Sequence, residues 1–204
     1  SKYRNAGQTC VCSNRLFVQE GVYDAFVQKL VSATADLQVG DGMDDGIAIG
    51  PLVNTKAVND VNELVEASVA AGASVALGGG PHDLGECFYQ PTVLTDITAD
   101  MAVFRNEIFG PVAPVVRFSS EEEVIAMAND TEFGLASYFY TRDIGRVWRV
   151  AEALDYGMVG INEGIISTEV APFGGVKESG LGREGSRYGI DEFLEMKYLC
   201  MGGL

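Results

Sequence analysis

Histidine and cysteine are scarce in this chain of 204 residues. His82 is the only histidine, and the four cysteines contain no C-x-x-C pair; they are Cys10, Cys12, Cys87 and Cys200. Four cysteines are too few for a disulfide scaffold, and a zinc site would have to gather single ligands from distant segments. We therefore predict no metal site. His82 lies in the turn-like stretch "GGGPHDLG", which argues against a protease-like pairing of cysteine and histidine.

Basic residues and long apolar runs are also lacking. The chain has 14 lysines and arginines against 29 acidic residues, a formal charge of −15. Nucleic-acid binding needs a basic surface, so we predict no nucleic-acid partner. No apolar run approaches the roughly 20 residues that cross a bilayer, so we predict no membrane span. The opening "SKYRNAGQTC" resembles neither a signal peptide nor a presequence, and free cysteines suit the cytoplasm or the mitochondrial matrix.

The remaining sequence alternates between helical and strand patterns. Helical periodicity covers 22–37, where Phe26, Leu30 and Val31 share a face, and 56–72, where Gly72 is a predicted C-cap. Further helices are predicted at 119–130, which starts with a capping box, and at 144–154. Strands are predicted at 73–79, 89–97, 111–120, 136–141 and 157–162. This alternation predicts an α/β fold with a largely parallel sheet flanked by helices.

The last thirty residues have a different pattern. "PFGGVKESGLGREGSRYG" (172–189) predicts a long Gly-rich loop, and "EFLEMKYLCMGG" predicts a strand without a local partner. We predict one compact domain over 1–190 and a strand within 191–204 that pairs with another domain or subunit. "GLGREG" matches G-x-G-x-x-G, but "VKES" precedes it instead of an apolar strand, and the chain ends before a second strand and its ribose-binding acid, about 20 residues on, could fit. We interpret it as a flexible loop, so the chain has no complete nucleotide site.

Two residues are candidates for chemistry. Cys10 is flanked by small polar residues and Gly7, so it is either a reactive thiol or a buried bystander. At a helix start, its pKa would be lowered and its backbone N–H could hold an oxyanion. Glu107 stands in "NEIFGP" before a Gly-Pro break, where it is either a displayed site acid or a capping or surface glutamate. The residues alone leave both pairs of alternatives open.

Four segments together resemble the catalytic half of the aldehyde dehydrogenase superfamily. They are "GQTCVCSNR", "NEIFGPVAP", "NDTEFGLASYFYT" and "APFGGVKESGLGREG", in the family's order and with similar gaps, and the resemblance covers residues 1–204. The stretches "RNAGQTCVCSNR", "GIISTEVAPFGG" and "GSRYGIDEFLEMKYLC" resemble the members that oxidise succinate semialdehyde, with glutarate semialdehyde as the alternative substrate. A non-catalytic interaction module of the same fold and a weak thiol esterase are the competing interpretations.

The resemblance implies roles for individual residues. It makes Cys10 the nucleophile that forms a thiohemiacetal and then a thioester with the aldehyde. It makes Glu107 the ligand of the nicotinamide-ribose hydroxyls, with Phe109 packed beside the ring. It places Arg4 and Ser167 on the substrate carboxylate, where a guanidinium fork and a hydroxyl suit that group.

The same resemblance places Phe173 in the wall of the substrate pocket. It also implies an N-terminal cofactor domain, whose motifs do not occur in residues 1–204, and a homo-oligomer joined through the last strand. NAD or NADP would be bound mainly by that missing domain, so we predict that this chain alone has negligible dehydrogenase activity. Separately, Cys12 lies two residues from Cys10, and a strained disulfide between them is a candidate redox switch.

Overall fold

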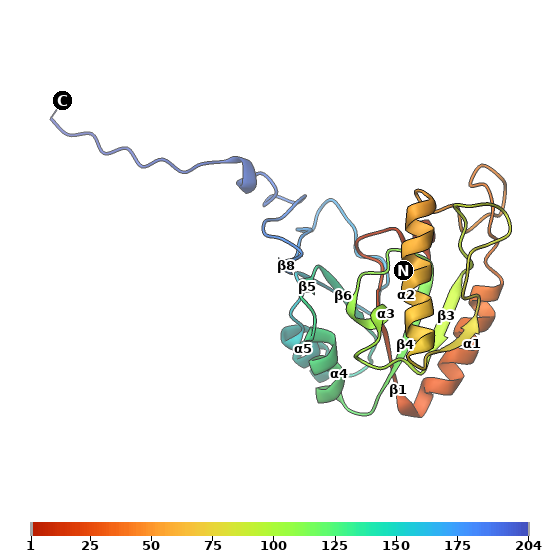
Figure 1. The fold of residues 1–204 in the computed structure, drawn as a ribbon. Coiled ribbons are helices and arrows are strands. Elements are labelled where there is room, and N and C mark those ends of the chain that lie inside the picture. Colours follow the sequence, from red (N-terminus) through yellow and green to blue (C-terminus); the bar gives the residue numbers. More distant parts are fainter. Residues whose placement is uncertain (1, 204) are drawn as a thin grey trace. The chain divides into compact units, whose positions relative to one another are not determined.

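The computed structural model describes residues 2–203 and divides into two compact units, Ser1–Thr131 and Glu132–Leu204 (Figure 1). The first unit contains η1 (Arg4–Gly7), β1 (Leu16–Gln19), η2 (Glu20–Val22), α1 (Tyr23–Ala35), α2 (Thr55–Ala70), β2 (Ser74–Leu77), β3 (Thr92–Thr95), α3 (Ala102–Arg105), β4 (Val112–Phe118) and α4 (Glu121–Asn129). The second contains β5 (Phe133–Gly134), β6 (Ala136–Phe139), α5 (Ile144–Ala153), β7 (Met158–Ile161), β8 (Val176–Lys177) and η3 (Asp191–Phe193). The division falls inside the predicted 1–190 domain, whose catalytic assignment stays a prediction.

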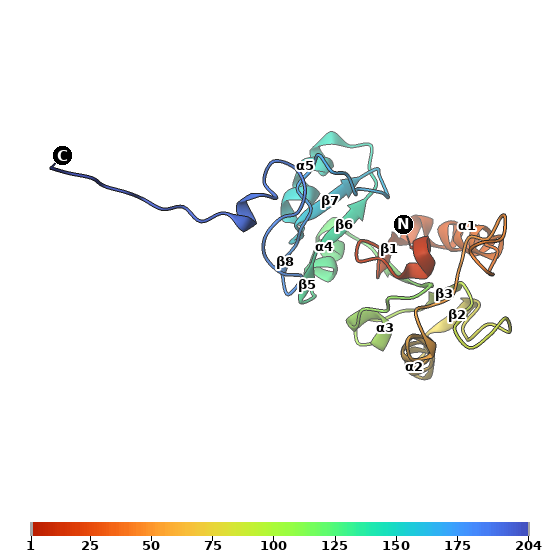
Figure 2. The same ribbon diagram turned by 90° about the horizontal axis from the view of Figure 1, so that it is seen from above.

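The first unit is built on a four-stranded sheet in the order β1-β4-β3-β2. β4 pairs in parallel with both β1 and β3, whereas β2 pairs antiparallel with β3 at one edge. Figure 2 shows α1 and α2 on opposite sides of these strands. The predicted α/β fold, with a largely parallel sheet flanked by helices, is confirmed.

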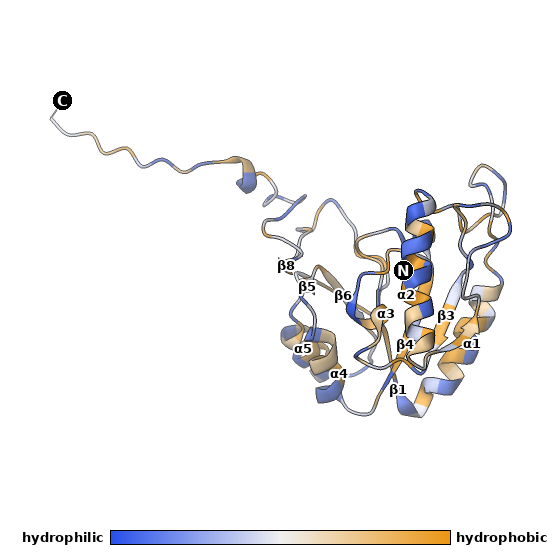
Figure 3. Cartoon of the chain, viewed as in Figure 1, coloured by the Kyte–Doolittle hydropathy of each residue, from blue (hydrophilic) through white to orange (hydrophobic). Residues whose placement is uncertain are grey.

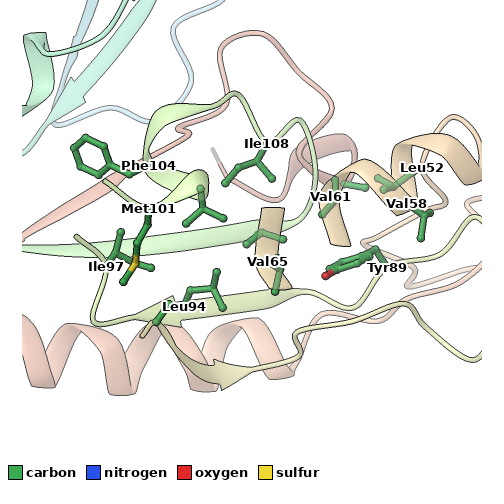
Figure 4. Packing of buried hydrophobic residues seen from close by; sticks show 14 of the residues in the cluster. Leu52, Val58, Val61, Val65, Tyr89, Leu94, Ile97, Met101, Phe104 and Ile108 are labelled. Atoms are coloured by element: carbon green, nitrogen blue, oxygen red, sulfur yellow. The ribbon is translucent and has the colours of Figure 1, made fainter. Parts of the chain in front are cut away.

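Alternation along the two central strands explains why both faces of this sheet are covered. Leu94 and Val112 join the cluster that includes Val65 of α2, whereas Val93 and Val115 join the cluster packed against α1. Successive side chains of a strand point to opposite faces of the sheet. Apolar residues at both odd and even positions therefore make both faces apolar, and a helix must cover each face. Figure 4 shows part of the larger cluster, and Figure 3 shows that α2 has an apolar and a polar side.

Side-chain caps start three of the helices. Asn54, Ser120 and Asp143 accept backbone hydrogen bonds from residues three positions later, at 2.9, 3.2 and 3.0 Å. The Ser120 cap of the capping box predicted before α4 is therefore confirmed, and the Glu123 carboxylate accepts from the Ser119 N–H at 2.7 Å. Gly72 follows α2 with φ of 110°, as its predicted role at the C-terminal end requires. The predicted face of α1 is partly wrong, because Phe26 is 38% exposed.

The second unit has two small sheets. β6 and β7 pair in parallel, with α5 between them in sequence, and β5 pairs antiparallel with β8. The stretch 172–189 is thus not a continuous loop, because it contains β8 and a bridge between Phe173 and Glu184. Residues 194–203 form no helix or strand, and the pairing predicted for 191–204 stays a prediction.

No helix within residues 2–203 is long and apolar enough to cross a membrane. Gly180, Gly182 and Gly185 of "GLGREG" have φ of 97°, 86° and 65°, values that favour glycine in turns. Within the described chain, no helix begins at this segment, as a dinucleotide fingerprint would require. The interpretation of "GLGREG" as a loop is confirmed.

Candidate functional site

Cys10 lies in a tight turn of the first unit. The Cys12 N–H donates to the Thr9 carbonyl oxygen at 2.8 Å, which closes the turn, and Cys10 is exposed while Val11 is buried. The chain then enters β1 at Leu16, so Cys10 does not start a helix and gains no helix dipole. The expected helix start is therefore wrong, whereas the exposed side chain makes the thiol reachable.

Hydrogen bonds anchor the loop around Cys10 to distant segments. The Tyr3 hydroxyl donates to the Thr92 carbonyl oxygen at 2.9 Å, and burial raises the pKa of Tyr3 to about 12, so the hydroxyl keeps its proton. The Gln8 amide donates to the Pro51 carbonyl oxygen at 3.3 Å and accepts from the Val53 N–H at 2.8 Å. The residues before Cys10 are thereby tied to β3 and to the loop at 51–53.

The backbone before Cys10 also packs directly on the segment "NEIFGP" (106–111). Asn5, Ala6 and Gly7 have φ of 51°, 55° and 79°, so the chain turns through three left-handed residues in a row. A Cβ atom at Gly7 would lie 2.1 Å from the Gly110 carbonyl oxygen. Only glycine permits this contact, which confirms that Gly7 allows close backbone approach.

Asn14 joins the two segments a second time. Its side-chain amide donates to the Asn106 carbonyl oxygen at 2.9 Å and accepts from the Ile108 N–H at 2.9 Å. Glu107 lies between these two residues and is exposed, and Phe109 is 44% exposed with φ of 49°. The structure therefore places the Cys10 loop against the segment that displays Glu107 and Phe109.

Lys2 is a charged residue that the sequence did not reveal as part of this region. Its side chain is buried, with 6% exposure, and burial lowers its pKa from 10.5 to about 8. Electrostatic interactions with Cys12 and Glu107 oppose this shift and favour the ammonium form of Lys2. Lys2 thus lies within electrostatic range of both the second thiol and the displayed carboxylate.

We expect Lys2→Met to stabilise the chain in a pH-dependent manner. Between pH 8 and 10.5 the unfolded chain binds more protons at Lys2 than the folded chain does, so the free energy of unfolding rises with pH in this range. Below pH 8, the full free-energy cost of burying the charged Lys2 ammonium applies. The free energy of unfolding should increase by about 3 kcal/mol at pH 7 and by much less at pH 10. Urea denaturation of both proteins at each pH measures this, with exposed Lys29→Met as control. An equal difference at both pH values would contradict the assignment.

Arg4 and Cys12 lie close in the same loop. The Cys12 thiol donates to the Arg4 carbonyl oxygen at 3.7 Å, and both Cys10 and Cys12 are free thiols. Arg4 is exposed and lines a cavity of about 370 Å³ together with Lys2, Tyr3, Leu30, Ala33, Thr34, Leu37, Ala48 and Ile49. The disulfide between Cys10 and Cys12 stays a prediction.

The two remaining candidates belong to the second unit. Ser167 is exposed in the stretch between β7 and β8. Phe173 is half-buried, and its backbone exchanges hydrogen bonds of 2.9 and 2.7 Å with Glu184. Their grouping with Arg4 and Cys10 stays a prediction. Among residues 2–203, no three histidine, cysteine or acidic side chains cluster in a way that could hold a metal ion.

Comparisons with known proteins show what this chain is similar to. Glutarate-semialdehyde dehydrogenase of Pseudomonas aeruginosa is 63% identical over 204 residues, which are 100% of this chain and 42% of that protein. The NADP(+) succinate-semialdehyde dehydrogenase of Escherichia coli (strain K12) is 60% identical over 202 residues, 99% of this chain and 42% of that protein.

A solved structure gives the same result. The crystal structure of succinate-semialdehyde dehydrogenase from Burkholderia pseudomallei matches with a TM-score of 0.96 and 62% identity, covering 98% of this chain and 42% of that one. The chain therefore spans less than half the length of these relatives. The sequence profile described as "Aldehyde dehydrogenase family" matches residues 1–199. By this match and these identities, the chain belongs to the aldehyde dehydrogenase family.

Proposed function

We propose that this chain is the C-terminal catalytic half of an NAD(P)-dependent succinate-semialdehyde dehydrogenase, with glutarate semialdehyde as the alternative substrate. The observation that carries the proposal is the exposed Cys10, held on an anchored loop against the segment that displays Glu107. Two relatives named for these semialdehydes are 63% and 60% identical to this chain, which supports this substrate class.

Cys10 performs the covalent chemistry in this proposal. Its thiolate attacks the aldehyde carbon to form a C–S bond, and the oxyanion accepts a hydrogen bond from the Cys10 backbone N–H. The dinucleotide, when bound, supplies the acceptor for the hydride that leaves this carbon. Water then cleaves the resulting thioester, which releases the acid and returns the thiol. In this proposal, the base that takes the proton from this water lies in the part of the relatives' length that these 204 residues do not span.

The residues near Cys10 fit such a cofactor. Glu107 offers an exposed carboxylate, an acceptor suited to ribose hydroxyls, and Phe109 offers a partly exposed ring beside it. Both stand on backbone that Gly7 and Asn14 hold against the Cys10 loop. In this proposal, Glu107 and Phe109 hold the nicotinamide riboside, and the rest of the dinucleotide is held by the part of the relatives' length that these 204 residues do not span.

Arg4 selects the substrate in this proposal, together with Ser167 and Phe173. We expect Arg4→Met to raise KM for succinate semialdehyde by about 100-fold, because a charge-assisted pair with the substrate carboxylate is lost. KM for butyraldehyde, which has no carboxylate, should change less than about twofold. Exposed Arg142→Met serves as the control. Equal losses with both aldehydes would remove Arg4 from the carboxylate site.

A non-catalytic interaction module of the same fold is the second candidate. The chain spans less than half the length of its relatives, and residues 194–203 lack a strand partner within the described chain. In the dehydrogenase, this segment pairs within a homo-oligomer. In the module, it would bind another protein through the same backbone groups. The location, cytoplasm or mitochondrial matrix, stays part of the proposal.

Turnover of succinate semialdehyde tests the proposal. We would measure it with NAD and with NADP, for the chain alone and after adding the N-terminal cofactor domain of a relative. Activity only in the mixture would support the catalytic half, and the faster dinucleotide would identify the cofactor. Activity of the chain alone would contradict the requirement for a second half. If the mixed domains bind each other without turnover, the interaction module is favoured.

A further inference from the structure

Asn14 holds the backbone on both sides of Glu107. Its amide nitrogen donates to the Asn106 carbonyl oxygen, and its amide oxygen accepts from the Ile108 N–H, each at 2.9 Å. The donor and acceptor atoms require this orientation of the amide, because reversing it would oppose two acceptors and two donors. The Asn14 side chain thus bridges the two residues on either side of Glu107, whose carboxylate is exposed.

Besides Asn14, the segment around Glu107 is held by the packing of Ile108 in the larger apolar cluster and by a hydrogen bond from the Asn106 side-chain amide to the Ala102 carbonyl oxygen at 3.0 Å. Residues 106–110 form neither helix nor strand. Hydrogen bonds resume upstream, from the Asn106 N–H to the Ala102 carbonyl oxygen, and downstream, from the Val112 N–H to the Gly110 carbonyl oxygen. Ile108 is 4% exposed, so without Asn14 its N–H would lose a protein acceptor in a site with little water.

Asn14 also belongs to the loop of the thiol. It follows Cys10 by four residues, and Gly7 of the same loop contacts Gly110 just beyond Glu107. The position of the Glu107 carboxylate therefore depends on the loop that carries Cys10 and not on the sheet alone. Hydride transfer between a substrate on Cys10 and a dinucleotide on Glu107 requires a fixed distance and orientation between these two side chains.

We propose that Asn14 is a positioning residue, which sets the orientation in which Glu107 meets the dinucleotide. This inference rests on the proposed function, because it takes Glu107 as a cofactor ligand. Asn14 touches neither substrate nor cofactor in this role and acts through the backbone at 106 and 108.

The test uses Asn14→Leu, which removes both hydrogen bonds at similar volume, and Asn14→Asp, which keeps only the acceptor. The matched control is Asn62→Leu, because Asn62 also makes two side-chain hydrogen bonds, with Glu66 at 2.8 Å and Tyr89 at 3.3 Å. Amide hydrogen exchange of Ile108 is measured in the chain itself. Exchange should accelerate by about tenfold or more in Asn14→Leu and stay slow in Asn14→Asp and Asn62→Leu.

The second readout is the dissociation constant of the dinucleotide, measured with the cofactor domain added. Asn14→Leu should weaken it by about tenfold, while the rate of Cys10 alkylation without cofactor and KM for the aldehyde change less than about twofold. Weakening by Glu107→Gln but not by Asn14→Leu would overturn the positioning role alone. No weakening by Glu107→Gln would instead overturn the cofactor role of Glu107 in the proposed function. If Asn62→Leu weakened dinucleotide binding as much as Asn14→Leu does, Asn14 would contribute only to overall stability, and the inference would be overturned.

Discussion

Cys10→Ala will abolish aldehyde oxidation, with kcat/KM falling by about 10⁴-fold or more. The thiolate forms the only covalent bond between enzyme and substrate in the proposed reaction, so its loss removes both the thiohemiacetal and the thioester. The exposed position of Cys10 in the Thr9–Cys12 turn also means that alanine fits without a packing cost. Thermal stability should therefore be close to that of the parent protein.

Two measurements isolate this effect. Turnover is measured with the cofactor domain added, and mass spectrometry of the quenched reaction should find the acyl group on Cys10 in the parent protein alone. Cys87→Ala is the matched control, because Cys87 is half-buried and its sulfur lies 3.9 Å from the Thr55 hydroxyl, outside the site. Retention of a tenth of the activity by Cys10→Ala would assign the nucleophile to another residue.

Gly7→Ala should strongly destabilise the chain. The new methyl group would lie 2.1 Å from the Gly110 carbonyl oxygen, and φ of 79° strains any residue with a Cβ. Because the obstacle is backbone, it yields only if the Cys10 loop and the 106–110 segment separate. We expect a loss of about 3 kcal/mol or more in the free energy of unfolding, and loss of turnover in the folded fraction.

Two other glycines separate the causes of this loss. Gly46 has φ of 83° but no atom within 4 Å of an added Cβ, so Gly46→Ala measures backbone strain alone, about 1 kcal/mol. Gly42 has neither constraint, and Gly42→Ala should be nearly neutral. Urea denaturation of the three variants gives the comparison. A loss for Gly7→Ala no larger than for Gly46→Ala would show that the two segments are not in the contact described.

The sequence by itself determined the class of the fold and identified the candidate residues for the proposed chemistry. Apolar runs in 89–97 and 111–120 predict buried strands because both faces of such strands must be covered. Caps such as Ser120 and Gly72 mark helix ends because their hydrogen bonds and φ angles are local. Cys10 and Glu107 were recognisable as candidates from the residues beside them, and the family resemblance gave them roles.

Only the tertiary structure decided how these residues are held. Asn14 and Asn106 lie 92 positions apart, and no local pattern predicts that an uncharged amide bridges them. The burial of Lys2, the close contact of Gly7 with Gly110, and the exposed Phe26 likewise depend on which surfaces meet after folding. The division into two compact units after residue 131 is likewise not marked in the sequence by a Gly- or Pro-rich linker. Local hydrogen bonds and hydrophobic periodicity can be predicted from short segments of sequence. Long-range packing forms only when distant segments come together on folding.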